Sequence, residues 1–302
     1  MWFKNLRVYH LKENLSISQE TLETQLKSFA FAPCTSDQTE TQGLVPPLGD
    51  KTDSLYHVSD GQYLFAARFE KKLLPASVVK DMVNEKVEEF ESEKGRKPKG
   101  KEKSEIKDAV MLYLLPKAFA VHSDIYAIID PKNALVYVDT ASAAKAEAVL
   151  SLVRKALGTL PVEPLKVNES ASSAMTGWLL ENRLPSRFQT GDQISMYSTR
   201  NEKKVVNAKT DDLMEDEILN HLKQDKIVSK IALVFDETLS FVLDEELNIK
   251  RLKFTEEFFE REEETENEDA LARLAADIFA QLAVFSRLTP YIIREFGGLA
   301  QS

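Results

Sequence analysis

The chain has 302 residues, of which 43% are hydrophobic and 29% charged, a composition typical of a globular protein with a substantial core. Its length allows two or three domains or lobes, and no apolar run is long enough to span a bilayer. The N-terminus lacks a small-residue cleavage site, so we expect a strand there and no signal peptide. A single cysteine, Cys34, excludes an intrachain disulfide and fits a reducing cytoplasm.

The net charge of −10 is unevenly distributed along the chain. Residues 255–269 hold nine acidic residues and one arginine, and residues 211–217 hold five acidic residues, which leaves a net of +3 for the rest. A solvated acidic face is the default interpretation of such runs. The asymmetry allows one face of the molecule to bind nucleic acid, without proving that it does.

In the first half, the patterns predict strands in hairpins, separated by helices. A helix is expected to open at Ser18, with Leu22, Leu26 and Phe29 on one face, and the Pro- and Gly-containing stretch 31–54 is typical of a surface connection. The other predicted elements are a strand at 2–11, a hairpin at 56–58 and 62–69, helices at 75–94 and from Ser104 to Pro116, a hairpin at 124–130 and 134–139, and a helix at 142–157 closed by Gly158.

In the second half, Pro161 and Pro164 indicate a boundary, and Pro290 favours a kink in the last helix. The predicted elements are a helix at 175–184, strands at 193–197 and 204–209, a helix opened by Asp211 and Asp212, a meander of strands at 227–235, 239–243 and 248–254, and a helix at 269–295. Because the strands come as hairpins interleaved with helices, the sequence predicts an α+β fold with antiparallel sheets and packed helices, not a doubly wound parallel sheet.

The most basic stretch lies between two predicted helices and would form the turn of a helical hairpin. Residues 94–107 hold seven basic and two acidic residues, a local net of +5. A phosphate polymer would bind such a tip, because each neutralised phosphate releases condensed counterions. The alternative, a solvated turn whose lysines serve solubility, stays open. The candidate DNA-binding residues of the tip are Lys94, Arg96, Lys97, Lys99, Lys101 and Lys103.

The sequence predicts no enzyme chemistry. It contains no Walker phosphate loop, no GxGxxG and no nucleophile elbow. His10, His57, His122 and His221 fall in four separate predicted elements, without a Cys or carboxylate partner at metal-ligand spacing. Cys34 fits a small packed thiol better than a nucleophile. We therefore expect no catalytic residue, no bound metal and no cofactor.

Several stretches resemble the recombination-associated protein RdgC family of bacteria: MWFKNLRVYHL, FAPC followed by GLVPPLG, LLPKAF, VYVDTASAAKAE, RKALGTLPVEPL and IKRLKF. They occur in order over nearly the whole chain, although residues 166–204 do not match the family pattern clearly. The resemblance implies a ring-shaped homodimer that encloses double-stranded DNA without sequence specificity, associates with the nucleoid in the cytoplasm and limits RecA-mediated recombination. Binding of single-stranded DNA stays open.

The resemblance also implies a division into domains. Residues 1–74 and 120–165 would form a central α+β domain, residues 75–119 an inserted helical tip, and residues 166–302 a C-terminal base. Lys117 and Phe119 would stand where the tip returns to the central sheet. Lys132, in a hairpin turn, and Lys209, beside an acidic helix start, are lower-ranked candidates for the DNA-binding inner wall.

Phe119 has three alternative roles, because a large ring just beyond a helix stop can be core, a subunit contact or a base-stacking wedge. Core comes first from the usual burial of Phe. A dimer contact that closes the ring comes next, since aromatic residues are favoured at interface centres. Stacking on DNA comes last.

We interpret the chain as a DNA-binding protein and not an enzyme, and two other classes remain as alternatives. The first is a cytoplasmic protein–protein adaptor that uses the helical hairpin and the acidic C-terminal region, and a steep salt dependence of DNA affinity would argue against it. The second is a metal nuclease, for which the sequence shows no ligand cluster.

Overall fold

A computed structural model describes residues 2–300 except residues 14, 16, 18, 50 and 263–269. Its first half contains β1 (Asn5–Leu11), α1 (Gln19–Lys27), β2 (Glu40–Val45), β3 (Tyr56–Ser59), β4 (Gln62–Lys72), α2 (Ala76–Lys94), α3 (Gly100–Leu114), the 3₁₀ turn η1 (Leu115–Lys117), β5 (Ala120–Asp130), β6 (Leu135–Val138) and α4 (Ala143–Leu157). Its second half contains β7 (Val162–Pro164), α5 (Ala171–Leu180), β8 (Phe188–Ser198), β9 (Asn201–Lys209), α6 (Asp216–Lys223), β10 (Lys226–Phe235), β11 (Leu239–Asp244), β12 (Ile249–Phe254), α7 (Glu256–Glu262) and α8 (Ala270–Glu295).

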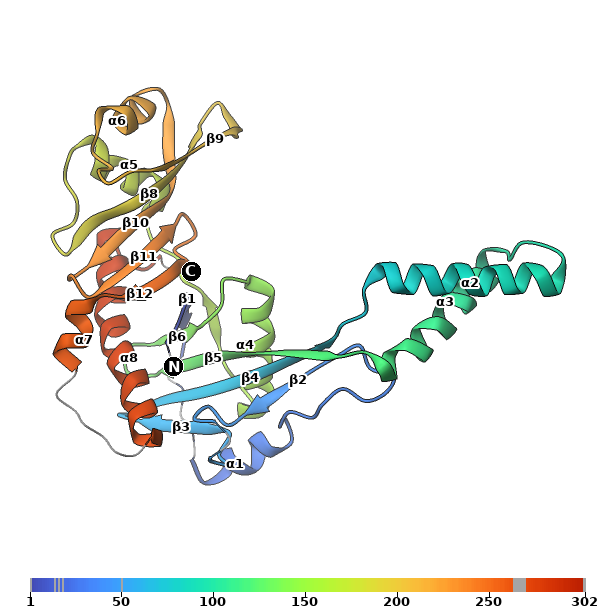
Figure 1. Ribbon diagram of the computed structural model, residues 1–302. Coiled ribbons are helices and arrows are strands. Elements are labelled where there is room, and N and C mark those ends of the chain that lie inside the picture. The colour runs from blue at the N-terminus through green and yellow to red at the C-terminus, as the bar shows by residue number, and fades with distance from the viewer. Residues whose placement is uncertain are drawn as a thin grey trace.

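Twelve strands of the described chain form one sheet (Figure 1). Ten of them follow the order β2-β4-β5-β6-β1-β12-β11-β10-β8-β9, while β3 pairs with β4 and β7 with β1. The pairings between these strands are antiparallel. The predicted α+β class with antiparallel strands is therefore confirmed. Among the described residues, no helix is long and apolar enough to cross a membrane.

The N-terminal strand β1 joins the two halves of the sheet. Residues 7–10 pair with β6, whereas Asn5 and Leu6 pair with Lys250 and Ile249 of β12. The side chains of β1 alternate between two cores, since Leu6 belongs to one buried cluster and Tyr9 to the other. A single strand thus contributes to both halves of the molecule.

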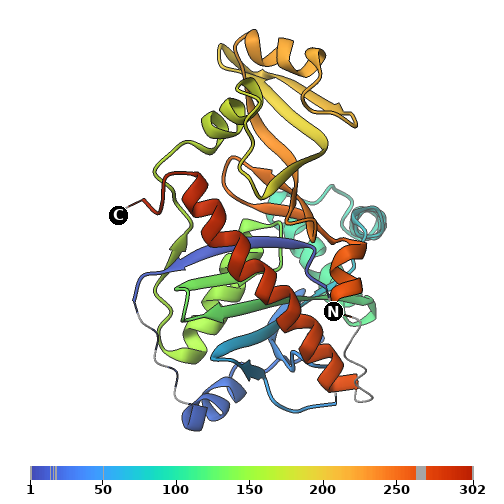
Figure 2. The same cartoon turned by 90° about the vertical axis from the view of Figure 1, so that its left-hand side faces the viewer.

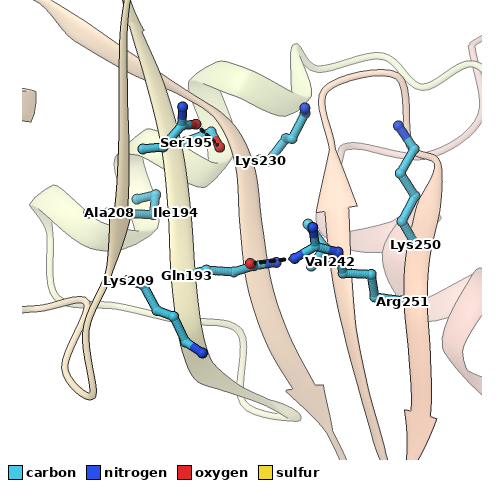
Figure 3. Close-up of a pocket in the computed structure, with 10 residues that line it drawn as sticks. Gln193, Ile194, Ser195, Ala208, Lys209, Lys230, Val242, Lys250 and Arg251 are labelled. Atoms are coloured by element: carbon cyan, nitrogen blue, oxygen red, sulfur yellow. Dashed lines mark hydrogen bonds between the residues drawn. The ribbon is translucent and has the colours of Figure 1, made fainter.

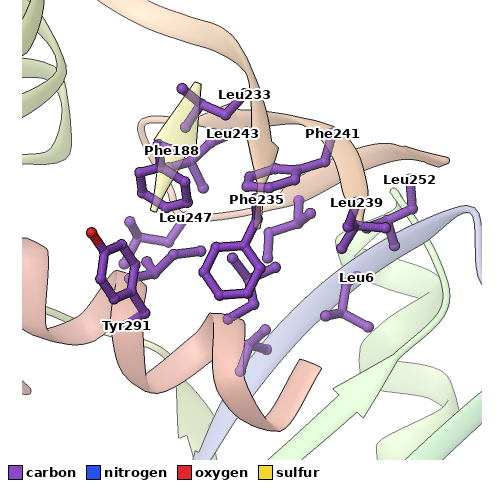
Figure 4. Close-up of a cluster of buried hydrophobic side chains, with 14 of the residues drawn as sticks. Leu6, Phe188, Leu233, Phe235, Leu239, Phe241, Leu243, Leu247, Leu252 and Tyr291 are labelled. Carbon is purple, nitrogen blue, oxygen red and sulfur yellow. The ribbon is translucent and has the colours of Figure 1, made fainter. Parts of the chain in front are cut away.

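Helix α8 covers one face of this joined sheet (Figure 2). The ring of Phe285 lies 5.8 Å from that of Phe3 and 6.0 Å from that of Tyr137, and the Gln281 side chain accepts a hydrogen bond from the Phe3 backbone N–H at 2.8 Å. Further along α8, Tyr291 meets aromatic side chains of the second half (Figure 4). Helices α1 and α4 pack on the opposite face of the first half. The first half is therefore covered on both faces.

The α2/α3 hairpin projects away from the sheet (Figure 1). Its own core is small, with Val83, Val110 and Leu114 as the buried members of the cluster. Gly95 ends α2 with φ of 66°, as predicted for a glycine cap. The second helix begins at Gly100 and not near Ser104, because the Glu102 carboxylate accepts the Lys99 backbone N–H at 2.8 Å and so caps an earlier start.

Two features of the structure depart from the sequence-based expectations. The predicted surface connection contains β2, which pairs with β4 along its whole length. Between Pro161 and Leu165, where a boundary is predicted, the short strand β7 pairs with β1, and the boundary itself stays a prediction. Helix α6 begins at Asp216, because the Asp212 carboxylate accepts the Met214 N–H at 2.8 Å and holds a turn before it.

The acidic run 255–269 is partly helical, since residues 256–262 form α7. Residues 263–269 and the predicted helix start at Ser18 lie outside the described residues. Helix α8 continues through Pro290 as one element. The division into four domain segments stays a prediction, within which the hairpin falls inside the range 75–119.

Candidate nucleic-acid interface

The β8–β12 part of the sheet has one face against α5, α6 and α8 and an opposite face that carries no helix in Figures 1 and 2. Strand alternation explains the difference between these faces. On the covered face, Ile194, Ile231 and Leu233 join the core. Their neighbours Gln193 and Lys230 point to the other side and line a surface hollow there. We call this other side the uncovered face.

The uncovered face contains a hollow of about 390 Å³ that is lined by four cationic side chains (Figure 3). Lys209 pairs with Asp192 at 3.2 Å, and both are well exposed. Such exposed pairs contribute little to stability and are readily exchanged. The remaining wall is neutral and polar or apolar. The cations of the uncovered face are Lys209, Lys230, Lys250 and Arg251.

These cations differ in how far they are neutralised. The Lys250 ammonium lies 2.7 Å from the buried carboxylate of Asp244, so its charge is largely neutralised by this ion pair. Arg251 donates to the neutral Gln193 side chain at 2.8 Å. Within the described residues, Lys230 and Arg251 make no ion pair. The uncovered face therefore keeps positive charge available for an anion.

The tip of the hairpin is also basic, but its arginine is engaged. The Arg96 guanidinium donates to both carboxylate oxygens of Glu102, at 2.7 and 2.8 Å, and lies over the Phe90 ring at 5.4 Å. Arg96 thus holds the turn between the two helices in shape. The exposed lysines around this turn are Lys94, Lys97, Lys99, Lys101 and Lys103.

The other predicted binding residues lie apart from these two clusters. The Lys117 ammonium sits 3.5 Å from the centre of the Tyr113 ring at the base of the hairpin. Lys132 borders a hollow together with Phe279 and Ser286 of α8, so it lies beside that helix and not beside Lys209. The structure therefore brings together one predicted residue, Lys209, with three that the sequence did not single out.

Phe119 is 85% exposed, which excludes the core role placed first from the sequence. It follows η1, and its carbonyl accepts the Leu73 N–H at 2.7 Å where the hairpin joins the β4–β5 pair. A subunit contact and base stacking both remain compatible with this position.

The histidines and the cysteine give no constellation for catalysis in the described residues. His10, His57, His122 and His221 lie in β1, β3, β5 and α6. No group of three or more His, Cys, Asp or Glu side chains that could hold a metal ion occurs in the part of the chain that the structure describes. Partial burial, followed by the Glu70 carboxylate, raises the pKa of the Cys34 thiol, which disfavours a reactive thiolate.

The geometry defines an α+β protein with a basic, uncovered sheet face and a basic projecting hairpin. A family model described as "Putative exonuclease, RdgC" matches residues 1–299, including the segment 166–204 in which no clear match was expected. The chain is similar to proteins named recombination-associated protein RdgC from Aeromonas hydrophila, at 44% identity over 302 residues and 100% of both chains, and from Psychromonas ingrahamii, at 40% over 299 residues and 99% of both. The one from Proteus mirabilis is 39% identical over 301 residues and 100% of both chains. The chain belongs to the RdgC family of recombination-associated proteins.

The Arg96–Glu102 contact predicts a measurable pKa. Hydrogen bonds from Arg96, followed by the Lys99 backbone N–H, lower the pKa of Glu102 to about 2. A carboxylate whose pKa is lower in the folded than in the unfolded chain stabilises the fold at every pH above its unfolded pKa. The contribution of Glu102 to stability is therefore present near neutral pH and is lost as pH falls from about 4.3 through 2. A carboxyl-carbon NMR titration should show a Glu102 midpoint near 2 in the parent. In Arg96→Gln the midpoint should be higher but still below the unfolded value, because the Lys99 backbone N–H remains. Equal midpoints would show that Arg96 does not hold Glu102.

Proposed function

We propose that this chain is a sequence-independent DNA-binding protein that forms a ring-shaped homodimer around duplex DNA, associates with the nucleoid in the cytoplasm and limits RecA-mediated recombination. The observation that carries the proposal is the basic uncovered face of β8–β12, which looks toward the same side of the molecule as the basic hairpin (Figure 1). The relatives' name supports a role connected with recombination.

Contact with backbone phosphates accounts for binding without sequence preference. Lys and Arg on a sheet face neutralise phosphates and need no helix in the major groove. The acidic α7 lies next to α8, away from the uncovered face (Figure 1). Its negative charge would disfavour DNA on that outer side and direct it toward the basic side. Occupation of the duplex would then limit access by the recombinase.

Two copies that face each other would complete the ring. Each subunit offers a base at one end and a projecting hairpin at the other, which corresponds to the proposed division into a central domain, a tip (75–119) and a base (166–302). Phe119 is our proposed dimer contact, because a large exposed ring at the root of the hairpin is unfavourable in water and aromatic residues are favoured at interface centres. Lys117, where the hairpin returns to the sheet, and the lower-ranked Lys132 are further proposed DNA contacts.

We propose that the chain binds DNA without cleaving it, although the family model's description includes exonuclease. Metal-dependent nucleases hold their ions with clustered carboxylates, and no such cluster occurs among the described residues. End-labelled duplex incubated with the protein and Mg²⁺ or Mn²⁺ should keep its label. Time-dependent release of labelled nucleotides would contradict this part of the proposal.

The salt dependence of DNA binding should locate the contacts. In the parent, log K should fall linearly with log salt by about 0.9 per phosphate neutralised, and equally for duplexes of different sequence. Replacing Lys209 and Lys230 by Ser should make the slope shallower. Lys250 is left in place because it neutralises buried Asp244.

Two matched double variants complete this experiment. Lys97→Ser with Lys99→Ser tests the tip and leaves Arg96 to hold the turn. Lys27→Ser with Lys51→Ser removes the same charge from an exposed part of the first half and should leave the slope unchanged. A Lys209/Lys230 variant indistinguishable from this control would contradict the uncovered face as the interface, and a tip variant indistinguishable from it would favour the solvated-turn alternative.

Phe119→Ala should weaken dimerisation without affecting the fold. Since the side chain is exposed, the free energy of unfolding of the subunit should stay within about 0.5 kcal/mol of the parent's. The dimer dissociation constant measured by sedimentation should rise by about tenfold or more. Leu112→Ala, at another exposed position of the hairpin, is the control. An intact dimer with a loss of single-strand affinity alone would assign Phe119 to base stacking.

A further inference from the structure

Strand β12 contains a bulge in the middle of the uncovered face. Ser240 pairs with Lys253, but Val242 pairs with Lys250, so two residues of β12 stand opposite one residue of β11. The first of the two, Arg251, has a φ of 54°. This is the geometry of the bulge type whose first position is a left-handed residue and is ordinarily glycine. Here the chain places an arginine at that position.

The bulge changes which side chains reach the uncovered face. Ile249 and Leu252 are both buried in the core, although they are three residues apart and would point to opposite faces of a regular strand. The two residues between them, Lys250 and Arg251, consequently both line the hollow on the uncovered face. Without the extra residue, a lysine and an arginine in succession would be directed to opposite sides of the sheet.

Arg251 extends across the face toward β8. Its guanidinium bonds to the Gln193 side chain at 2.8 Å and lies over the intervening strands near Val242 (Figure 3). Gln193 is neutral, so it orients the guanidinium without compensating its charge. A guanidinium has five N–H donors in a rigid planar fork that matches two phosphate oxygens. Donors remain for a phosphate after Gln193 is satisfied.

The left-handed backbone of Arg251 is strained, and residues beside it at the start of β1 hold it in place. A residue other than glycine, asparagine or aspartate is uncommon at positive φ. Such a strained backbone persists only where the surrounding structure holds it in place. The Leu252 N–H donates to the Lys4 carbonyl at 2.9 Å, and the Arg251 N–H donates to the Asn5 side chain at 3.5 Å. The residues at the start of β1 therefore hold both backbone donors of the bulge.

A second register irregularity, in β10, also places a basic side chain on the uncovered face. Its register against β8 shifts between Val228 and Lys230. Val228 and Ile231 are both in the core, which leaves Ser229 and Lys230 on the uncovered side. The Lys230 ammonium is thus placed on the same face as Arg251. Two bulges on different strands concentrate charge on one surface.

We propose that Arg251 is a phosphate-contacting residue, which the left-handed bulge of β12 places centrally on the uncovered face at the expense of stability. This inference rests on the proposed DNA binding and assigns to Arg251, oriented by Gln193 and flanked by Lys230, the contact with one backbone phosphate.

The test uses two variants that remove the same side chain and differ in backbone preference. Arg251→Gly suits the left-handed conformation, whereas Arg251→Ala retains the strain. Both should lower duplex affinity about tenfold at moderate salt and make the salt slope shallower by about 0.9 for each arginine lost. The thermal midpoint should rise by ~2 °C in Arg251→Gly and not in Arg251→Ala.

In Arg251→Gly, a rise in thermal stability together with a fall in duplex affinity would separate a binding role of Arg251 from a structural one. If the parent and the Lys209/Lys230 variant behave as proposed but both Arg251 variants bind like the parent, this inference fails and the proposed function stands. An Arg251→Gly protein less stable than Arg251→Ala would also overturn it, because the bulge would then not be strained. A parent that shows no salt-dependent DNA binding would instead refute the proposed function.

Discussion

Pairing of β1 with strands from both halves of the chain is the constraint on which the rest of the structure depends. One edge of β1 takes β6, and the other takes β12 and β7. Because the two half-sheets are thereby continuous, α8 can pack over both, since Phe285 lies against Tyr137 of β6 and Phe254 of β12. Since α5, α6 and α8 lie on one face of β8–β12, the uncovered face carries no helix of the described structure (Figures 1 and 2). Its four cations line a surface hollow there.

Much of the fold is predictable where neighbouring residues determine it. The hairpins and the helix closed by Gly158 have short-range patterns, and the structure has them. The joined sheet had no such signal, because Leu6 and Ile249 are distant in sequence and pair only in the folded chain. Strand β2 was missed for a related reason, since its proline- and glycine-rich surroundings are typical of loops and its pairing with β4 determines its conformation.

The candidate site divides in the same way. The basic tip is a run of charge in the sequence, so it could be found directly, although the engagement of Arg96 by Glu102 could not. On the uncovered face only Lys209 was named, because Lys230 and Arg251 come from other strands and become its neighbours through pairing. One local signal existed: two adjacent basic residues between buried apolar positions break the two-residue period of β12. Whether Phe119 is buried depends on the tertiary packing of other elements around it, which the apolar character of the residue alone does not predict.

Lysine modification with and without DNA tests most directly the claim that the uncovered face of β8–β12 meets the duplex. An amine-reactive reagent followed by mass spectrometry compares the labelling rate of each lysine in the free protein and in the complex. The account predicts that duplex DNA slows the labelling of Lys209 and Lys230 and leaves Lys27 and Lys51 unchanged, all four being exposed in the free chain. Equal labelling of Lys209 and Lys230 in the two states, under conditions where the protein is saturated with DNA, would contradict it.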